Sequence, residues 1–518
     1  MGIKFKTAKE AMQTIPNNAV VATGGFVGIC VPEELEIELE KRYIETKQPK
    51  GLTLVYAAGQ GDGKEKGLNH LGHEGLVTKV IGGHWGLVPK LQKLALENKL
   101  EAYNLPQGVI SHMFRDIAAG KPGTLTHVGL KTFVDPRLEG GKINDVTKEE
   151  IVNLMEIDNE EYLYYKTFPV DVALLRGTYA DENGNISMEE EAVPLESLSI
   201  AAACKNSGGK VIVQVKKVVK AGSLDPKLIK IPGIYVDTVV EIEKEENHMQ
   251  TFSEMYNSSY TGNTVVPTNK NKPLALNAKK IIARRAAMEL IPNAIVNLGI
   301  GVPELVATVA NEEGIGDEMI LTVEAGPIGG VPAGGLSFGA STNPQVILDQ
   351  PYQFDFYDGG GLDLAFLGLA QCDKDGNINV SKFGPKVAGC GGFINITQNA
   401  QKVIYCGTFT AGGLKVEANN GELSIKNEGK IKKFVNEVEQ VTFSGKYAAE
   451  VGQPVLYVTE RAVFELRKEG LVLTEIASGV DLQTEVLDLI EFEVKIADDL
   501  KKMDSRIFKS EDMNLVIK

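Results

Sequence analysis

"VDVALLRGTYADENGNI", residues 170–186, and "LDLAFLGLAQCDKDGNI", residues 362–378, are two versions of one segment, and this pair decides the fold. Each begins with a short apolar run and ends in a polar turn. Strands that are buried on both faces of a parallel sheet have this continuous apolar character. Because the two versions stand 192 residues apart (362 minus 170), we expect the chain to contain two copies of one domain.

Three further pairs of matching segments occur in the same order along the chain. They are "AMQTIPNNAV" at 11–20 with "AMELIPNAIV" at 287–296, "VPE" at 31–33 with 302–304, and "KVI" at 210–212 with 402–404. The offset between the copies falls from 271 at VPE to 192 at KVI. The first copy therefore carries 79 extra residues (271 minus 192) before its strand at 170.

A polar stretch without periodicity, residues 246–275, has no partner in either copy and is expected to be a linker. This places an N-terminal domain at 1–245 and a C-terminal domain at 276–518. Within each copy, apolar strand-like runs alternate with helical segments. In two of these, "VPEELEIELEKRY" at 31–43 and "VPELVATVANEEG" at 302–314, a proline opens the first turn. The expected fold class is α/β, with two similar tandem domains and mainly parallel sheets.

Composition excludes several classes of function. The net charge of −15 argues against a nucleic-acid or anionic-membrane surface, which would need a basic face. The five cysteines are scattered and form no CxxC pair, as is typical of a reduced, cytoplasmic protein. The N-terminus "MGIKFKTAKE" has no apolar signal core. We therefore expect a cytoplasmic protein that binds neither nucleic acid nor membrane.

Histidine and cysteine offer few catalytic candidates. All six histidines precede residue 249, which excludes a Ser-His-Asp or Cys-His site built within the second copy. His70 and His73 of "HLGH", with Glu74, are either a metal cluster or polar side chains in a glycine-flanked loop, and we favour the loop. Cys390 in "AGCGG" is either a thiol among ligand-binding glycines or a small residue in a tight turn. We expect no metal site.

One acid, Glu324, lies where the apolar run of "LTVEAGPIGGVPAGG", residues 321–335, meets a glycine-rich loop. Ligands of open α/β sheets bind beyond the carboxyl ends of the strands, and this position fits that rule. A carboxylate has a pKa of ~4.3, so it is an ionised nucleophile at pH 7 without a general base. Glycine N–H groups can stabilise an oxyanion. The alternative is a helix-capping or salt-bridged Glu.

Several motifs resemble those of the family I CoA-transferases, in particular the short-chain acetate/propionate branch. They include "AYNLPQG" at 102–108, "VEAGPIGGVPAGG" at 323–335 and "DGNINVSKFGPKVAGCGGFINIT" at 375–397. The resemblance covers nearly the whole chain, and the order and spacing of the motifs agree with it. It implies two similar α/β domains with the active site between them, and a homo-oligomer.

The resemblance also implies roles for individual residues. The family's glutamate, which becomes a glutamyl-CoA thioester, falls on Glu324. Its oxyanion donors fall on Gln107 of "LPQG" and on Gly392 of "GCGG". The expected reaction moves CoA between a short acyl-CoA and a free carboxylic acid by ping-pong kinetics. No permanently bound cofactor is expected, because CoA is itself the substrate.

Four further residues are expected to contact CoA. Gly389 and Gly391 belong to the same glycine loop as Gly392, and Lys382 and Lys386 of "SKFGPK" are phosphate partners unless they are merely solvated surface lysines. Such loops bring backbone N–H groups close to a ligand because glycine carries no Cβ.

Two departures from the family pattern affect the expected substrate and CoA binding. The 3-oxoacid branch has a Ser-Glu-Asn-Gly loop where this chain has Val323-Glu-Ala-Gly, which argues against acetoacetate as the preferred substrate. Cys30 stands where the first signature has glycine. Three alternatives stay open: an acyl-CoA thioesterase, a non-catalytic CoA or sugar-phosphate binding module, and a CoA-transferase for a larger acid such as an arylacrylate or 3-oxo acid.

Overall fold

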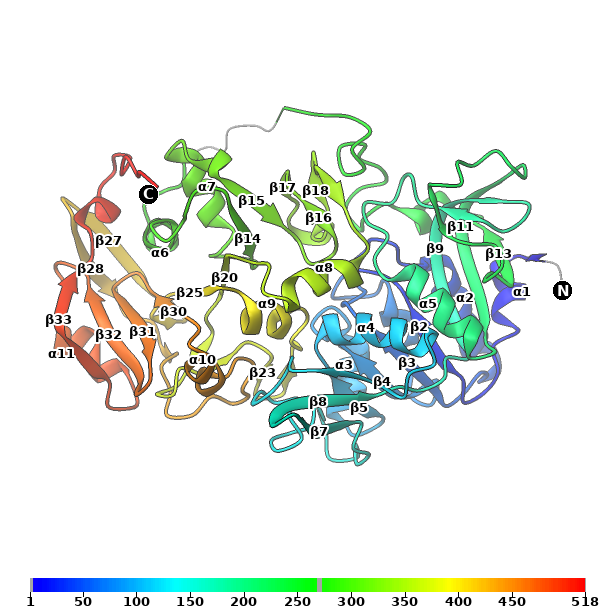
Figure 1. Ribbon diagram of the computed structural model, residues 1–518, viewed down its shortest axis with the longest axis horizontal. Coiled ribbons are helices and arrows are strands. Elements are labelled where there is room, and N and C mark those ends of the chain that lie inside the picture. Colours follow the sequence, from blue (N-terminus) through cyan, green and yellow to red (C-terminus); the bar gives the residue numbers. More distant parts are fainter. Residues whose placement is uncertain (1–2, 268–272, 518) are drawn as a thin grey trace. The chain divides into compact units, whose positions relative to one another are not determined.

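The computed structural model describes residues 3–267 and 273–517, which form two compact units (Figure 1). Unit 1 comprises residues 1–266, 323–355 and 384–395, and unit 2 comprises residues 267–322, 356–383 and 396–518. Neither unit is one continuous stretch of chain. The domain boundaries expected from the repeat remain a prediction, because a repeat is defined by sequence similarity and a compact unit by contacts within the folded chain. Residues 268–272 of the expected linker lie outside the described residues.

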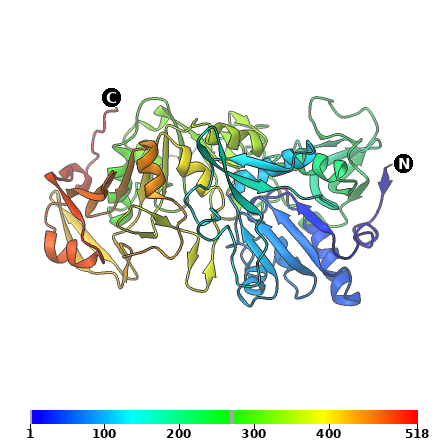
Figure 2. The same cartoon turned by 60° about the horizontal axis from the view of Figure 1, so that its bottom comes forward.

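Unit 1 is built on a ten-stranded sheet, and strand pairs along its main path are parallel. The main path has the order β1-β13-β11-β9-β2-β3-β4-β5, with β10 and β12 attached at its side. Figure 2 shows β2 to β5 side by side in shades of blue. The strands are β1 (Lys4–Phe5), β2 (Val20–Thr23), β3 (Leu52–Tyr56), β4 (Val77–Gly82), β5 (Glu101–Asn104), β9 (Val172–Asp181), β10 (Ile186–Ser187), β11 (Lys210–Val219), β12 (Ile229–Ile231) and β13 (Thr238–Glu241).

Five helices follow strands or connect them in unit 1. They are α1 (Ala8–Met12), α2 (Glu33–Thr46), α3 (Pro89–Leu96), α4 (Gln107–Ala118) and α5 (Ser197–Asn206). Helices α4 and α5 pack against each other (Figure 1). Local sequence sets the helix ends: the side chain of Thr7 accepts from the Glu10 N–H, and the side chain of Glu10 reaches back to the Thr7 N–H, which is a capping box.

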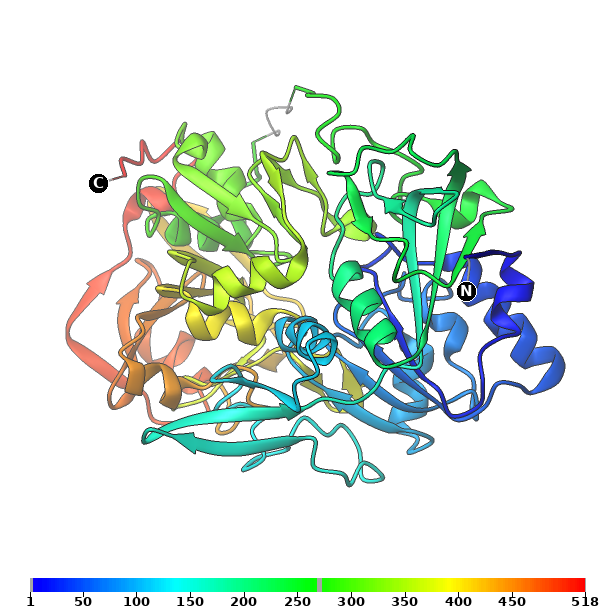
Figure 3. The ribbon, with the colours of Figure 1, turned by 45° about the vertical axis from the view of Figure 1, so that its right-hand side comes forward.

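The extra residues of the first copy add strands to this unit. Besides β4 and β5, they supply a separate antiparallel sheet of order β6-β8-β7, whose β7–β8 ribbon is drawn in teal in Figure 3. Its strands are β6 (Gly123–Thr126), β7 (Val152–Ile157) and β8 (Glu160–Lys166). The segments that the second half of the chain contributes contain β16 (Pro327–Ile328), β17 (Val331–Pro332), β18 (Ser341–Thr342), β19 (Val346–Ile347) and β24 (Lys386–Val387).

Unit 2 has its own sheet, of order β15-β14-β20-β25-β30-β31-β32-β33. Neighbouring strands from β15 to β30 are parallel, whereas β31 is antiparallel to both its neighbours. These strands are β14 (Ala294–Leu298), β15 (Met319–Thr322), β20 (Leu364–Gly368), β25 (Lys402–Cys406), β30 (Val455–Val458), β31 (Ala462–Arg467), β32 (Gly470–Ile476) and β33 (Lys495–Lys502).

Helices and short strand pairs complete the second half of the chain. The helices are α6 (Ala278–Ala287), α7 (Leu305–Glu312), α8 (Gln350–Asp358), α9 (Phe393–Asn399), α10 (Gly445–Val451) and α11 (Leu482–Glu485). The short strands are β21 (Gln371–Cys372), β22 (Ile378–Asn379), β23 (Lys382–Phe383), β26 (Thr410–Ala411), β27 (Lys415–Asn419), β28 (Glu422–Asn427) and β29 (Ile431–Lys432). Phe434 packs between Phe409 and Phe464, at ring-centroid distances of 4.9 Å to each, in the core of unit 2.

The register of the two sheets confirms the repeat. In unit 1, Lys210 of β11 stands opposite Val172 of β9, and in unit 2, Lys402 of β25 stands opposite Leu364 of β20. Both residues of the second pair are 192 positions beyond those of the first. The order β11-β9-β2-β3 is repeated as β25-β20-β14-β15. Two α/β halves with large, mainly parallel sheets are therefore confirmed.

The predicted helix starts are slightly displaced. Pro32 is the residue before α2 and Pro303 lies two residues before α7, so neither proline is inside the first turn. None of the helices in the described part of the chain combines the length and the apolar character that a membrane crossing requires.

Candidate active site

Glu324 lies in a tight turn that begins two residues after β15 ends. The N–H of Gly326 donates to the carbonyl oxygen of Val323 at 3.0 Å. The N–H of Val323 donates to the carbonyl oxygen of Pro327, also at 3.0 Å. Val323 and Ala325 are buried, whereas Glu324 is half-buried. Glu324 is therefore the one partly exposed residue of the segment 322–326.

Gly326 has to be glycine in this turn. Its φ is +135°, and a Cβ on it would lie 2.1 Å from the carbonyl oxygen of Leu348. Real Cβ atoms do not approach a carbonyl so closely, and a side chain rarely adopts this φ. The conformation of the Glu324 turn therefore depends on the glycine two residues later.

The neighbours of Glu324 pack into an apolar cluster of unit 1 that contains strained backbone. Val323 and Ala325 share this cluster with Val27, Cys30 and Leu195. The last three have left-handed φ values of 55°, 56° and 54°, which is unusual for residues with side chains of this size. Strained residues of this kind persist where the surrounding packing fixes them, and they gather at functional sites.

The backbone conformation of Cys30 suits the glycine that the family signature has at this position. At φ 56° a glycine is unstrained, and Cys30 adopts the same conformation with its Sγ 3.0 Å from the carbonyl oxygen of Val193. Burial raises the pKa of its thiol well above the usual range, with Glu191 adding to the effect, so the group is a neutral thiol. All five cysteines of the chain are buried and free.

Gln107 is the first residue of α4, three residues after the carboxyl end of β5, and it is buried. The backbone N–H of Gln107 donates to the carbonyl oxygen of Gly391 at 2.9 Å, and the Gly391 N–H donates to the carbonyl oxygen of Gly83 at 2.8 Å. The next residue, Gly108, donates its N–H to Asn395 Oδ1 at 3.1 Å. The first turn of α4 is therefore fixed against the glycine loop by backbone donors, and the side-chain amide of Gln107 takes no part in this attachment.

The glycines of the loop differ in what surrounds them. A Cβ on Gly389 would lie 2.9 Å from the Trp85 nitrogen, so this glycine serves a close approach between backbone segments. A Cβ on Gly391 would meet nothing closer than 3.7 Å, and Gln107 Oε1 is one of its two nearest atoms. Gly392 directly precedes α9, so its N–H lies outside the hydrogen-bond ladder of that helix.

A helix that begins at Gln350 holds both the Glu324 turn and Gln107. From its first turn, Gln353 Nε2 donates to the carbonyl oxygen of Val323 at 3.3 Å. From the same turn, Gln350 Oε1 accepts from Gln107 Nε2 at 3.1 Å. The amide of Gln350 in turn donates from Nε2 to Glu196 Oε2 at 2.8 Å. The structure thus connects two of the predicted catalytic residues through the first turn of α8.

The two predicted phosphate partners lie on short strands. Lys382 is half-buried in β23, which belongs to unit 2, and Lys386 is exposed in β24, which belongs to unit 1. Their contact with CoA remains a prediction.

Sequence reasoning missed His84, which follows the carboxyl end of β4 in "GGHWG". Hydrogen bonds fix the backbone on both sides of His84. The carbonyl oxygen of Gly83 accepts from the Gly391 N–H, and the N–H of Trp85 donates to the Ala388 carbonyl oxygen at 2.7 Å. Among the described residues no group hydrogen-bonds its buried Nδ1. Burial lowers the pKa of His84 to about 4, so the ring is neutral at pH 7. A histidine between glycines just after a strand is the signal that the sequence offered.

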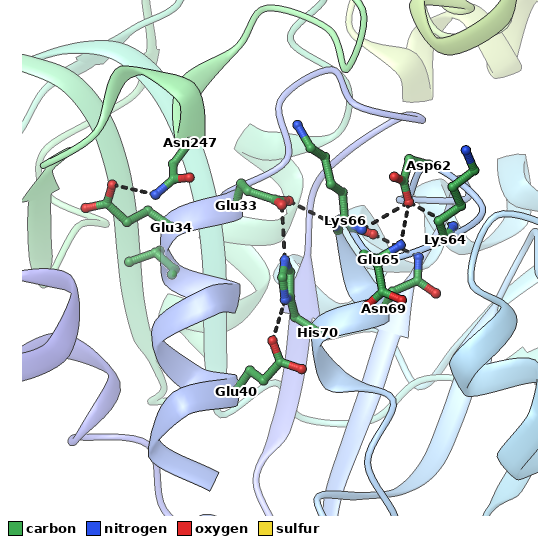
Figure 4. Close-up of polar contacts among 12 residues, drawn as sticks. Glu33, Glu34, Glu40, Asp62, Lys64, Glu65, Lys66, Asn69, His70 and Asn247 are labelled. Carbon is green, nitrogen blue, oxygen red and sulfur yellow. Dashed lines mark hydrogen bonds and ion pairs between the residues drawn. The ribbon is translucent and has the colours of Figure 1, made fainter. Parts of the chain in front are cut away.

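The "HLGH" histidines form ion pairs instead of a metal cluster. Figure 4 shows His70 between Glu33 and Glu40, with Nε2 3.1 Å from Glu33 Oε1 and Nδ1 2.6 Å from Glu40 Oε2. Burial acts to lower the pKa of His70, but the hydrogen bonds that its ring donates to the two carboxylates raise it to about 10. A protonated imidazole cannot ligate a metal. The expected loop is wrong here, since Leu68–Leu71 form a 3-10 helix.

Glu74, the third candidate of that cluster, pairs with Lys99 at 3.1 Å. In residues 3–267 and 273–517, no group of three or more His, Cys, Asp or Glu side chains is arranged to hold a metal ion.

Comparison with known proteins places this geometry in context. A family model described as Coenzyme A transferase matches residues 5–242. The chain is similar to the caffeate CoA-transferase of Acetobacterium woodii, with 48% identity over 510 residues that cover 98% of this chain and 97% of that protein. It is 44% identical over 514 residues to the acetate CoA-transferase YdiF of Escherichia coli (strain K12), covering 99% and 96%.

Crystal structures of acyl-CoA transferase YdiF from Escherichia coli O157:H7 have the same fold. The apoenzyme gives a TM-score of 0.94 at 43% identity, covering 100% of this chain and 98% of that one. A structure described as a thioester complex with CoA gives a TM-score of 0.93 at 43% identity, with the same coverage.

Proposed function

The chain belongs to the Coenzyme A transferase family, family I, and we propose that it moves CoA between a short-chain acyl-CoA and a free carboxylate through a thioester on Glu324. The observation that carries the proposal is the first turn of α8, which hydrogen-bonds both the residue before Glu324 and the amide of Gln107. Nucleophile and oxyanion donor thus share one rigid support, as a preorganised site needs.

In the first half-reaction, a Glu324 carboxylate oxygen attacks the carbonyl carbon of the acyl-CoA. The C–S bond breaks and its electron pair leaves with the CoA thiolate, which gives an acyl-glutamyl anhydride. A thiol pKa of ~8.5 makes the thiolate an adequate leaving group without a protonating acid. The thiolate then attacks the Glu324 carbonyl, releases the first carboxylate and leaves CoA on the enzyme as a thioester. A second carboxylate reverses these steps.

In each addition, negative charge develops on the oxygen of the carbonyl group that is attacked. We assign its stabilisation to the Gln107 amide and the Gly392 N–H, with Gly389 and Gly391 shaping the loop that carries the latter. Gln107 Nε2 has two N–H groups, and Gln350 accepts from only one of them. The other is free to donate to the oxyanion. CoA itself is the substrate, and Lys382 and Lys386 are the proposed contacts for its phosphates.

For the substrate, we propose acetyl-CoA, propionyl-CoA or a related short acyl-CoA, with a small carboxylic acid as acceptor. The acetate CoA-transferase YdiF resembles this chain over nearly its full length. The caffeate CoA-transferase is similar over a comparable span, which favours an arylacrylate as a second candidate acceptor. One methylene changes pocket discrimination by only ~1–3 kcal/mol, so closely related acids are expected to compete. We further infer a homo-oligomer in the reducing cytoplasm, which suits five free cysteines.

The test uses acyl-CoA without an acceptor. Wild-type enzyme incubated with propionyl-CoA should gain the mass of CoA on the peptide that contains Glu324, whereas Glu324→Ala should gain nothing and lose activity. Glu437→Ala removes an exposed carboxylate in the same half of the chain and serves as the control. Free CoA released without an acceptor would identify a thioesterase, and full activity in Glu324→Ala would overturn the assignment. A competition panel of acetate, propionate, butyrate and an arylacrylate then ranks the acceptors.

A further inference from the structure

Three buried side chains of unit 1 form a hydrogen-bonded series that ends at the amide of Gln107. Glu196 Oε2 accepts from Gln350 Nε2 at 2.8 Å, and Gln350 Oε1 accepts from Gln107 Nε2 at 3.1 Å. Gln107 is 3% exposed, Gln350 0% and Glu196 1%. The series is therefore shielded from water, and each member has to satisfy the next.

We propose that Gln350 and Glu196 are positioning residues that set the direction of the Gln107 amide, so that an N–H and not the C=O faces the developing oxyanion. The inference rests on the proposed role of Gln107 as an oxyanion donor. Neither Gln350 nor Glu196 is assigned contact with the substrate.

An amide side chain has two nearly isosteric ends, one a donor and one an acceptor. If Gln107 were turned over, its carbonyl oxygen would face the oxyanion and repel it. Gln350 alone cannot prevent this, because its own amide can also turn over and present NH₂ to a reversed Gln107. A neighbour that fixes the direction of Gln350 is required.

Glu196 supplies that direction. Its Oε2 accepts a hydrogen bond, so Gln350 presents its NH₂ group to Glu196 and its carbonyl oxygen to Gln107. Gln107 then has to present its own NH₂ group to Gln350. The backbone N–H of Gln350 also donates to the carbonyl oxygen of Leu195 at 3.1 Å, which fixes the start of α8 next to Glu196.

The two oxygens of Glu196 differ in their surroundings. Oε2 accepts from Gln350 Nε2, whereas Oε1 is buried and has no hydrogen-bond partner among the described residues. Burial raises the pKa of the carboxyl to about 8. Oε2 is therefore the oxygen that Gln350 meets, and it meets it as an acceptor.

The backbone before Glu196 shows what holds it in place. Leu195 has φ 54°, an unfavourable conformation for leucine, and its side chain lies in the cluster with Val323 and Ala325. The same packing that flanks Glu324 therefore fixes the residue next to Glu196. Strain that is retained at such a position is typical of residues held for function.

A double-mutant cycle tests the inference. Gln350→Met removes both hydrogen bonds while keeping most of the volume, and it should lower kcat about tenfold or more with KM for acyl-CoA changed less than twofold. In a Gln107→Ala background the same change should lower kcat by less than twofold, because no amide is left to orient. Gln250→Met is the matched control: Gln250 is also buried with two side-chain hydrogen bonds in unit 1, and kcat should stay at the wild-type value.

Glu196→Gln gives a second test in which folding is less at risk. This variant keeps the volume but can present either end of an amide to Gln350, so kcat should fall several-fold while the melting temperature stays near that of the wild type. Unchanged kcat in both Gln350→Met and Glu196→Gln would overturn the inference, as would losses that multiply in the double mutant. The wild-type CoA adduct on Glu324 is measured separately, so its absence refutes the proposed function, whereas its presence with an additive cycle refutes only the positioning role.

Discussion

The backbone N–H of Gln107 donates to the carbonyl oxygen of Gly391 at 2.9 Å, although the two residues come from different copies of the repeat. This bond attaches the first residue of α4 to the glycine loop that precedes α9. It uses the backbone donor of Gln107, so the side-chain amide carries whatever interaction this residue makes with substrate. Four predictions follow from this arrangement and from the charged groups around it.

Removal of the Gln107 amide should slow the reaction without unfolding the protein. Loss of one oxyanion donor typically costs ~10² or more in kcat, because the donor acts on charge that develops only in the transition state. We expect this loss in Gln107→Ala, with KM for acyl-CoA little changed, measured by steady-state kinetics. A decrease in kcat of less than twofold would contradict the assigned role.

Gly326→Ala should damage the turn that carries Glu324. The new Cβ would lie 2.1 Å from the Leu348 carbonyl oxygen at a φ of +135°, so the backbone has to move. We expect a loss of about 2 kcal/mol or more in the free energy of unfolding, and a lower kcat. Gly334→Ala, in the same glycine-rich segment, meets no atom within 4 Å and should change stability by less than about 0.5 kcal/mol. Equal melting temperatures of the two variants would refute the steric argument.

The pKa values of two histidines of unit 1, His84 and His70, should be shifted in opposite directions. Burial lowers the pKa of His84 to about 4, whereas hydrogen bonds that the His70 ring donates to Glu33 and Glu40 overcome burial and raise the pKa of His70 to about 10. Between pH 5 and 8, ¹⁵N NMR of labelled histidine should therefore show the His84 ring as neutral and the His70 ring as cationic, with neither signal changing. His84→Phe and His70→Gln assign the two signals. A midpoint near 6.5 for either ring would show that its environment differs from the one described.

The carboxyl of Glu36 should make the protein less stable as pH rises. It is fully buried, and among the described residues neither of its oxygens has a hydrogen-bond partner. Burial, with the nearby Glu33, raises its pKa to about 8 from the ordinary value of 4.5. Between these two pKa values the folded state binds more protons than the unfolded state. The contribution of Glu36 to the free energy of unfolding is therefore fully present below pH 4.5 and is lost as the pH rises to 8.

Glu36→Gln removes this titration. At pH 7 the protein should have lost about 3 kcal/mol of its free energy of unfolding relative to pH 4.5, since one pKa unit corresponds to ~1.4 kcal/mol. Urea unfolding between pH 5 and 8 should show a flatter pH dependence in Glu36→Gln than in the wild type. Glu45→Gln, which changes an exposed carboxylate of the same helix, is the control and should keep the wild-type slope. Parallel curves for all three proteins would contradict the prediction.

The repeat and the strands could be predicted from sequence because each depends on local patterns. The apolar runs at 172–181 and 364–368 form strands, and the offset of 192 residues reappears in the pairing of Lys210 with Val172 and of Lys402 with Leu364. The position of Glu324 just beyond a strand was predictable for the same reason. The proline signals gave helix starts within one or two residues of those observed.

The residues around the candidate site were not predictable, because their roles depend on contacts between distant segments. Nothing near Gln350 or Glu196 in the sequence marks them, and only the folded chain places one against the other. His84 was visible as a histidine among glycines, but its neutral state results from burial. For the histidines of "HLGH" the sequence left open a metal cluster beside the favoured loop, and it could not show that Glu33 and Glu40, from another helix, are the partners of His70.

Unit 1 includes two pieces of chain, 323–355 and 384–395, that the second copy of the repeat contributes. A duplicated domain normally yields two modules that can be cut apart and expressed alone. Here a cut in the polar stretch before residue 276 would separate Gln107 from Glu324 and from Gly391, and each fragment would lack part of one folded unit. Unit 1 is therefore built from both copies, and a substitution in the N-terminal half can act on loops that the C-terminal half contributes.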